Sequence, residues 1–115
     1  MLPFFLRHNI SMNDFSSHIA IIGAGISGLT LGCVLKQSGV PVIIFEKSST
    51  ASEQGAGISI SPNGLRVLRN IGIENDLRSE SGNPKKVQFF YNQNKLTSFP
   101  IDVVTTSRQC LYKNL

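Results

Sequence analysis

Three glycines and one acidic residue have the spacing of a site that holds a nucleotide diphosphate. Gly23, Gly25 and Gly28 form a Gly-x-Gly-x-x-Gly turn, and Glu46 lies eighteen residues beyond the last glycine. The first glycine of such a turn permits a sharp bend, and the second lets the backbone approach a pyrophosphate closely. The third lets the helix pack tightly on the strands, and the first amides of that helix can donate to phosphates. A carboxylate at Glu46 can accept both ribose hydroxyls of an adenosine and repels a 2′-phosphate.

The segments around the turn have the patterns needed to position it. The apolar run 18–23 predicts a strand that is buried on both faces, and residues 40–46 predict a second, parallel strand. Residues 26–38 predict a helix that ends at Gly39. Its expected apolar stripe consists of Leu29, Leu31, Val34 and Leu35. Strand, glycine turn, helix, strand and acid in this order favour a dinucleotide-binding βαβ unit over a merely glycine-rich turn.

The rest of the chain predicts short helices and strands. The expected elements are an extended segment at 57–63, a helix at 64–70, a helical turn at 74–78, hairpin strands at 87–91 and 96–104 joined by 92–95, and a helix beginning within 105–115. Asn63 is expected to cap the first of these helices, and Thr106 or Ser107 the last. The hairpin strands add to the two parallel strands, but a doubly wound sheet normally has five or six strands.

Length and composition are those of one small globular domain, with 115 residues, 41% apolar residues and a net charge of +4. The basic residues are scattered rather than clustered, so we expect no nucleic-acid partner. No apolar run approaches the length of a membrane-spanning helix, so we expect no transmembrane segment. Cys33 and Cys110 lack the spacing of metal ligands, so we expect no metal site. We expect Cys33 to be a small buried apolar residue, and two unpaired cysteines fit a cytoplasmic protein.

The first residues are expected to lie outside the folded part. Residues 1–17 are interpreted as a disordered segment or an extension, and residues 18–115 as the domain. The apolar stretch at the N-terminus is too short and wrongly flanked for a signal peptide. Either Met1 or Met12 could be the start of translation, and the sequence does not decide between them.

Three segments of the chain resemble the FAD-dependent aromatic-ring hydroxylases. These are the single-component flavoprotein monooxygenases of the salicylate, 4-hydroxybenzoate and ubiquinone-biosynthesis types. The first segment is 23–47, which ends in an acid–base pair typical of such flavoproteins. The second is 55–73, with its Gly-x-Gly-Ile and Pro-Asn sequences, and the third is 107–115, with an Arg-x-x-Leu-x-x-x-Leu sequence. The chain departs from the family at Gly32, where the family usually has Ala.

The resemblance implies an α/β fold, namely a Rossmann-like FAD-binding βαβ unit with an added β-hairpin in an incomplete doubly wound domain. On this reading, residues 18–115 are the N-terminal part of the FAD-binding domain of a longer chain. The residues expected to bind the cofactor are Gly23, Ala24, Gly25, Ile26, Ser27, Gly28, Glu46, Lys47 and Arg108. The family's arginine at the position of Arg108 lies beside the flavin diphosphate and ribityl chain. No catalytic residue is assigned.

The implied activity is hydroxylation of a small aromatic or quinone-precursor ring with FAD, O₂ and NADPH or NADH. The flavin carries the redox chemistry, and the protein binds and orients it. Two alternatives stay open. The chain could be the FAD-binding part of another flavoprotein class, such as a halogenase or a geranylgeranyl reductase, or an inactive truncated fragment. The family's later Asp-Gly and Gly-Asp motifs are absent, so we expect little hydroxylase activity from this chain alone. Its sequence does not determine the substrate or the oligomeric state.

Overall fold

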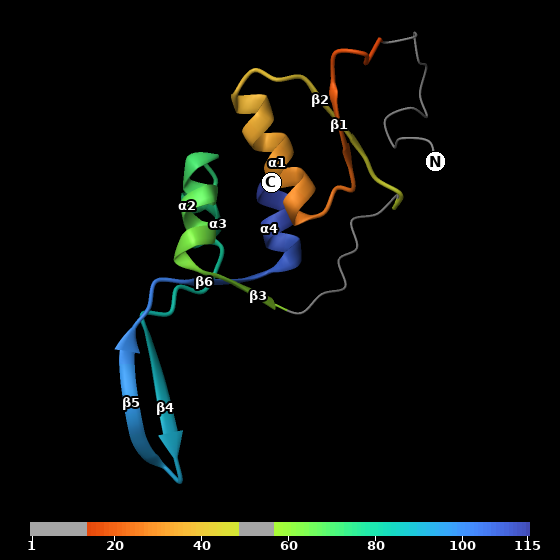
Figure 1. The fold of residues 1–115 in the computed structure, drawn as a ribbon. Coiled ribbons are helices and arrows are strands. Elements are labelled where there is room, and N and C mark those ends of the chain that lie inside the picture. The colour runs from red at the N-terminus through yellow and green to blue at the C-terminus, as the bar shows by residue number, and fades with distance from the viewer. Residues whose placement is uncertain (1–13, 49–56) are drawn as a thin grey trace. The chain divides into compact units, whose positions relative to one another are not determined.

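A computed structural model describes residues 14–48 and 57–115. The chain forms two compact units, of which the first runs from Met1 to Gln54 and includes Leu115, and the second runs from Gly55 to Asn114. Figure 1 shows the elements of both units. Most of the predicted N-terminal extension lies outside the described residues, so that prediction is not tested.

The first unit is a strand, a helix and a parallel strand. The elements are β1 (Ile19–Ile22), α1 (Ile26–Gln37) and β2 (Val42–Phe45). The two strands pair in parallel over four positions, from Ile19 opposite Val42 to Ile22 opposite Phe45. The predicted order of elements is confirmed, and both strands are shorter than predicted. The helix ends at Gln37, and Gly39 follows with a φ of 73° that suits a glycine.

The burial predicted for the first unit is wrong at several positions. Ile21 is the buried residue of β1, whereas Ile22 is 74% exposed, because this strand has one neighbouring strand and one covering helix in the described chain. Leu31 and Val34 of the expected apolar stripe are exposed. The face of α1 that meets the strands instead carries the small residues Gly28 and Gly32, as the site geometry below shows.

Cys33 is half-buried rather than buried. Its thiol donates a hydrogen bond to the backbone oxygen of Leu115 over 3.3 Å, within the first unit. A polar S–H group that has a partner is not the plain apolar filler that was predicted.

The second unit contains two antiparallel strand pairs and three helices among the described residues. Its elements are β3 (Gly57–Ile60), α2 (Pro62–Asn70), α3 (Glu74–Ser79), β4 (Lys86–Tyr91), β5 (Asn94–Pro100), β6 (Val104–Ser107) and α4 (Arg108–Asn114). β3 pairs with β6, and β4 pairs with β5. The fully buried side chains are Leu65, Leu77, Val104 and Leu111, one each from α2, α3, β6 and α4. These four side chains form the centre of the unit.

The start of α2 corrects one prediction. The helix begins at Pro62, so Asn63 is its second residue and Ser61 occupies the N-cap position. Proline is favoured at the first position of a helix because its missing N–H has no partner there. Asn63 therefore accepts a hydrogen bond from the Ser61 hydroxyl instead of capping the helix.

The hairpin differs from its prediction, whereas the predicted cap of the last helix is confirmed. The hairpin turn consists of two residues, Asn92 and Gln93, which both have positive φ, so the predicted four-residue connection is too long. The second hairpin strand ends at Pro100, whereas it was predicted to continue to Val104. Val104 instead begins β6, whose other residues, 105–107, were predicted to belong to the start of the last helix. Ser107 is the residue that caps α4, since its Oγ accepts the Cys110 N–H over 3.1 Å.

Candidate functional site

The glycine turn joins β1 to α1, and each of its three glycines meets a different structural requirement. Gly23 has a φ of 101°, and its N–H donates to the Phe45 carbonyl oxygen over 2.7 Å, which ties the turn to the end of β2. A Cβ on Gly28 would lie 2.0 Å from the Gly23 carbonyl oxygen, so only glycine permits this approach of helix to turn. Gly25 has an extended conformation, and nothing lies within 4 Å of where its Cβ would be. The backbone at Gly25 is therefore open to an approaching group.

The N-terminus of α1 is suited to an anion. Gly25 occupies the N-cap position, no side chain caps the helix there, and the first turn carries no acidic residue. The first N–H groups of a helix have no acceptor within the helix, and they lie at the positive end of its dipole. Ser27 is exposed, whereas Ile26 and Gly28 are half-buried. This part of the predicted set can donate several hydrogen bonds to a phosphate.

Glu46 lies directly after β2, and its carboxylate contacts the glycine turn. Oε2 accepts the Ala24 N–H over 2.7 Å, and Oε1 accepts the Ser48 N–H over 2.9 Å. These backbone hydrogen bonds, first that of Ser48 and then that of Ala24, hold the pKa of the Glu46 carboxyl below its usual value. The carboxylate is therefore ionised at neutral pH and sits beside the turn, as the spacing predicted. The following residue, Lys47, is exposed.

Arg108 lies in the second unit, where it is the first residue of α4 and is exposed. Its predicted approach to the glycine turn concerns the other unit, so that approach stays a prediction.

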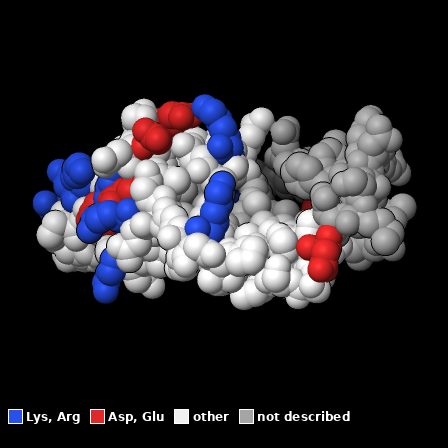
Figure 2. All heavy atoms as spheres, turned by 90° about the horizontal axis from the view of Figure 1, so that it is seen from above, with Lys and Arg blue, Asp and Glu red and all other residues white. Residues whose placement is uncertain are grey.

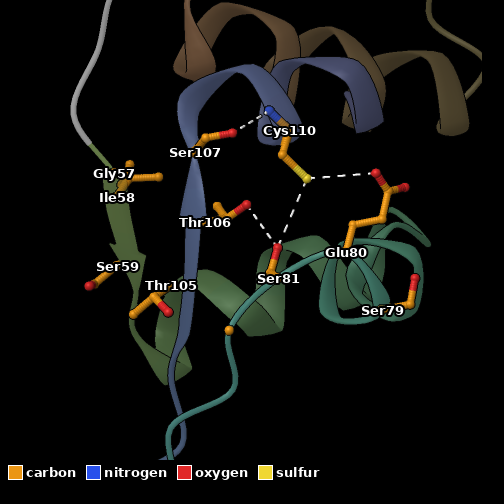
Figure 3. A pocket seen from close by; sticks show the side chains of 11 residues that line it. Gly57, Ile58, Ser59, Ser79, Glu80, Ser81, Thr105, Thr106, Ser107 and Cys110 are labelled. Atoms are coloured by element: carbon orange, nitrogen blue, oxygen red, sulfur yellow. Dashed lines mark hydrogen bonds between the residues drawn. The ribbon is translucent and has the colours of Figure 1, made fainter.

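The second unit contains a wide-open surface pocket of about 730 Å³ that the sequence did not indicate. It is lined by β3, β6, the first turn of α4 and the segment after α3 (Figure 3). The Ser81 hydroxyl donates to Thr106 Oγ1 over 2.8 Å, and the Cys110 thiol lies 3.9 Å from Glu80 Oε2. An antiparallel bridge between Gly82 and Thr105 of β6 brings the segment 79–84 close to Cys110.

On the face shown in Figure 2, basic and acidic side chains are interspersed with uncharged residues. Within residues 14–48 and 57–115, no three His, Cys, Asp or Glu side chains gather in a way that could hold a metal ion. The same residues include no helix with the length and apolar character to cross a membrane.

The chain belongs to the FAD binding domain family, which matches residues 16–114. It is 44% identical over 63 residues to the FAD-dependent monooxygenase pytG of Aspergillus terreus, a match covering 55% of this chain and 19% of that protein. It is 39% identical over 69 residues to 6-hydroxynicotinate 3-monooxygenase of Pseudomonas fluorescens, covering 60% of this chain and 18% of that protein. The predicted resemblance to flavoprotein monooxygenases is thus confirmed.

Solved structures of flavin hydroxylases share the fold. The tetrameric form of 2-methyl-3-hydroxypyridine-5-carboxylic acid oxygenase matches with a TM-score of 0.74 and 31% identity, covering 83% of this chain and 26% of that chain. HpxO of Klebsiella pneumoniae, solved with FAD and uric acid, matches with a TM-score of 0.67 and 27% identity, covering 82% and 26%. The chain therefore spans about a fifth of the length of these curated relatives and about a quarter of these solved chains.

Proposed function

We propose that this chain is the FAD-binding portion of a flavin-dependent monooxygenase that hydroxylates a small aromatic or heteroaromatic ring. One observation carries the proposal: the ionised Glu46 carboxylate is hydrogen-bonded to Ala24, inside the glycine turn. That contact joins the two parts of an adenosine diphosphate site, the ribose acceptor and the phosphate donors. The family match and the monooxygenase relatives support FAD as the nucleotide.

The residues fit the adenosine diphosphate half of FAD. The first amides of α1, at Ile26, Ser27 and Gly28, would donate to the diphosphate, and Gly25 leaves room for it. Glu46 would accept the ribose hydroxyls, and the Lys47 and Arg108 cations would offset the negative charge of the diphosphate. When bound, FAD supplies the redox chemistry that joins one oxygen atom of O₂ to the ring. This chain contributes binding and orientation of the cofactor.

Three finer proposals go with this function. The fold is the start of a Rossmann-like, doubly wound domain, which the parallel β1–α1–β2 unit supports. NADPH or NADH is the reductant, and the enzyme is cytoplasmic. The ring substrate is small, as the name of 6-hydroxynicotinate 3-monooxygenase indicates for that relative.

The test compares ADP with 2′-phospho-ADP by isothermal titration of the purified chain. We expect ADP to bind, and 2′-phospho-ADP to bind at least about tenfold more weakly, because Glu46 faces the added phosphate. Glu46→Gln should weaken ADP binding about ten- to a hundredfold and reduce this discrimination, since it removes a charged hydrogen-bond acceptor. Asp76→Asn, which removes an exposed carboxylate in the second unit, is the matched control and should change neither value. The proposal fails if Glu46→Gln retains both the affinity and the discrimination.

A further inference from the structure

The β4–β5 hairpin joins the rest of the second unit through two segments whose main-chain pairing is interrupted (Figure 1). On the hairpin side, the last ladder hydrogen bond runs from the Ile101 N–H to the Lys85 carbonyl oxygen, over 3.0 Å. On the other side of the interruption, Gly82 and Thr105 form an antiparallel bridge with two main-chain hydrogen bonds of 2.9 Å. The residues between these two points form a gap in the ladder at the base of the hairpin.

The gap contains unequal lengths of chain and a proline. Residues 83–84 on one side face residues 102–104 on the other, so the pairing changes its register by one residue across the gap. Pro84 has no N–H, and Val104 pairs with Ile60 of β3 instead. In the described part of the chain, no main-chain hydrogen bond joins these two segments. Such a break between two paired regions is a place where a few residues can absorb a change of angle.

One side chain spans this gap. Arg78 Nη1 donates to Asn83 Oδ1 over 3.1 Å, and Arg78 Nη2 donates to Asp102 Oδ1 over 2.9 Å. These two acceptors lie on opposite sides of the gap, one before β4 and one after β5. Asn83 Nδ2 in turn donates to the carbonyl oxygens of Arg78 and Ser81, over 2.9 Å each. The Arg78 guanidinium therefore takes the place of the missing main-chain hydrogen bonds.

The guanidinium of Arg78 is itself held in a fixed orientation. Its Nε donates to Oε1 of Glu74, a buried carboxylate, over 3.0 Å. Arg69 binds the same carboxylate, with its Nε 2.6 Å from Oε2 and its Nη2 3.1 Å from Oε1. The Arg78 side chain is 22% exposed and that of Arg69 is 63% exposed, so solvent screens the contacts of Arg78 less. A planar fork that is fixed at its base loses little side-chain freedom when its two outer nitrogens bind.

We propose that residues 83–84 and 102–104 are a hinge of the β4–β5 hairpin, and that Arg78 is the latch that holds this hinge at one angle. The proposal rests on contacts made within residues 69–105 of the second unit, and it does not depend on the nucleotide site of the first unit. Arg78 has a positioning role in it. When Nη1 and Nη2 lose their partners, the main-chain hydrogen bonds on both sides of the gap remain, and the hairpin can turn about the gap.

The test compares Arg78→Gln with Arg69→Gln in the whole chain by NMR. Both variants remove an arginine from the Glu74 carboxylate, but of the two arginines only Arg78 binds both sides of the gap. In the wild type, residual dipolar couplings of the β4–β5 and β3–β6 amides should fit one alignment tensor. In Arg78→Gln, the β4–β5 couplings should shrink and depart from that tensor. Hydrogen exchange of the Ile101 N–H should also rise at least about tenfold, because hydrogen bonds to a charged group are lost. Arg69→Gln should leave both measurements at the wild-type values.

Two further variants decide the question if Arg78→Gln does not fold. Asp102→Asn removes the charge of one partner, and the Asp102 side chain is 57% exposed, so the fold should be retained. Arg78→Lys keeps a positive charge beside Glu74 but lacks the planar fork that reaches both sides of the gap. Both variants should change the couplings and the Ile101 exchange in the same direction as Arg78→Gln. Wild-type values in both would overturn the proposal.

Three results with Arg78→Gln and its control would also overturn it. The first is a hairpin whose couplings depart from the β3–β6 tensor in the wild type, or still fit it in Arg78→Gln. The second is an equal effect of Arg69→Gln, because the loss of support for Glu74 would then be the cause. The third is a uniform rise in hydrogen exchange across β3, β6 and the hairpin, because Arg78 would then stabilise the whole unit rather than hold the hinge.

Discussion

Gly28→Ala tests whether helix propensity or packing controls the glycine turn. In a helix interior, alanine is favoured over glycine by about 1 kcal/mol, so propensity alone predicts a more stable first unit. The structure predicts instead that Gly28→Ala destabilises the first unit. The added Cβ would lie 2.0 Å from the Gly23 carbonyl oxygen and 3.3 Å from Ile21 Cγ2. A backbone oxygen cannot rotate away, so the cost lies at the upper end of the range for overpacking, about 3 kcal/mol. The net loss is then about 2 kcal/mol.

Gly32→Ala is the matched control on the same helix. Its Cβ would lie 3.0 Å from Ile44 Cδ1, which is the end of a flexible side chain and can move by the few tenths of an ångström required. The propensity gain of about 1 kcal/mol should offset that movement, so the variant should be as stable as the wild type within about 1 kcal/mol.

Native-state hydrogen exchange can measure the stability of the first unit separately in both variants. The reporter is the Gly23 N–H, which donates to Phe45 across the end of the strand pair. A loss of about 2 kcal/mol lowers its protection about thirtyfold in Gly28→Ala, with little change in Gly32→Ala. Protection in Gly28→Ala that equals or exceeds the wild-type value would refute the packing argument.

Three further predictions concern the site and the second unit. Gly25→Ala should leave the unfolding free energy within about 1 kcal/mol of wild type, since its Cβ meets nothing, but should weaken ADP binding in titration because it fills the path of the phosphates; unchanged ADP affinity would contradict the role of Gly25. Hydrogen bonds from Arg69, and then from Arg78, hold the pKa of the Glu74 carboxyl below its ordinary value. The contribution of Glu74 to the free energy of unfolding is therefore complete above that ordinary value and is lost as the pH falls through the lower pKa of the folded state. The urea midpoint of the second unit should therefore fall as the pH is lowered below the ordinary carboxyl pKa of 4.5, and this fall should be smaller in Glu74→Gln; an identical pH profile would exclude Glu74 as its cause. Arg108→Gln should weaken FAD binding about ten- to a hundredfold and make it less salt-dependent, with Arg66→Gln as the exposed control; equal affinities for FAD would remove Arg108 from the site.

Local sequence accounts for the first unit and its site. The glycine spacing and the position of Glu46 predicted the turn and the acid beside it, because both depend on residues joined by one strand–helix–strand unit. The β-branched and aromatic residues of β4 and the polar residues after them predicted a hairpin, although the turn is shorter than expected. Such features repeat within a few residues, so composition and spacing are enough to indicate them.

Tertiary structure decided what depends on residues that are distant in the sequence. β6 is a separate strand because it pairs with β3, about fifty residues earlier; Pro100 favours a strand end, but no local pattern predicts the new partner. The exposure of Leu31 and Val34 follows from how few strands α1 covers, which periodicity cannot show. Likewise, Arg78 holds Asp102 only because the chain returns past α3 after the hairpin. Long-range pairing has no signature in neighbouring residues, so its consequences appear only in the folded chain.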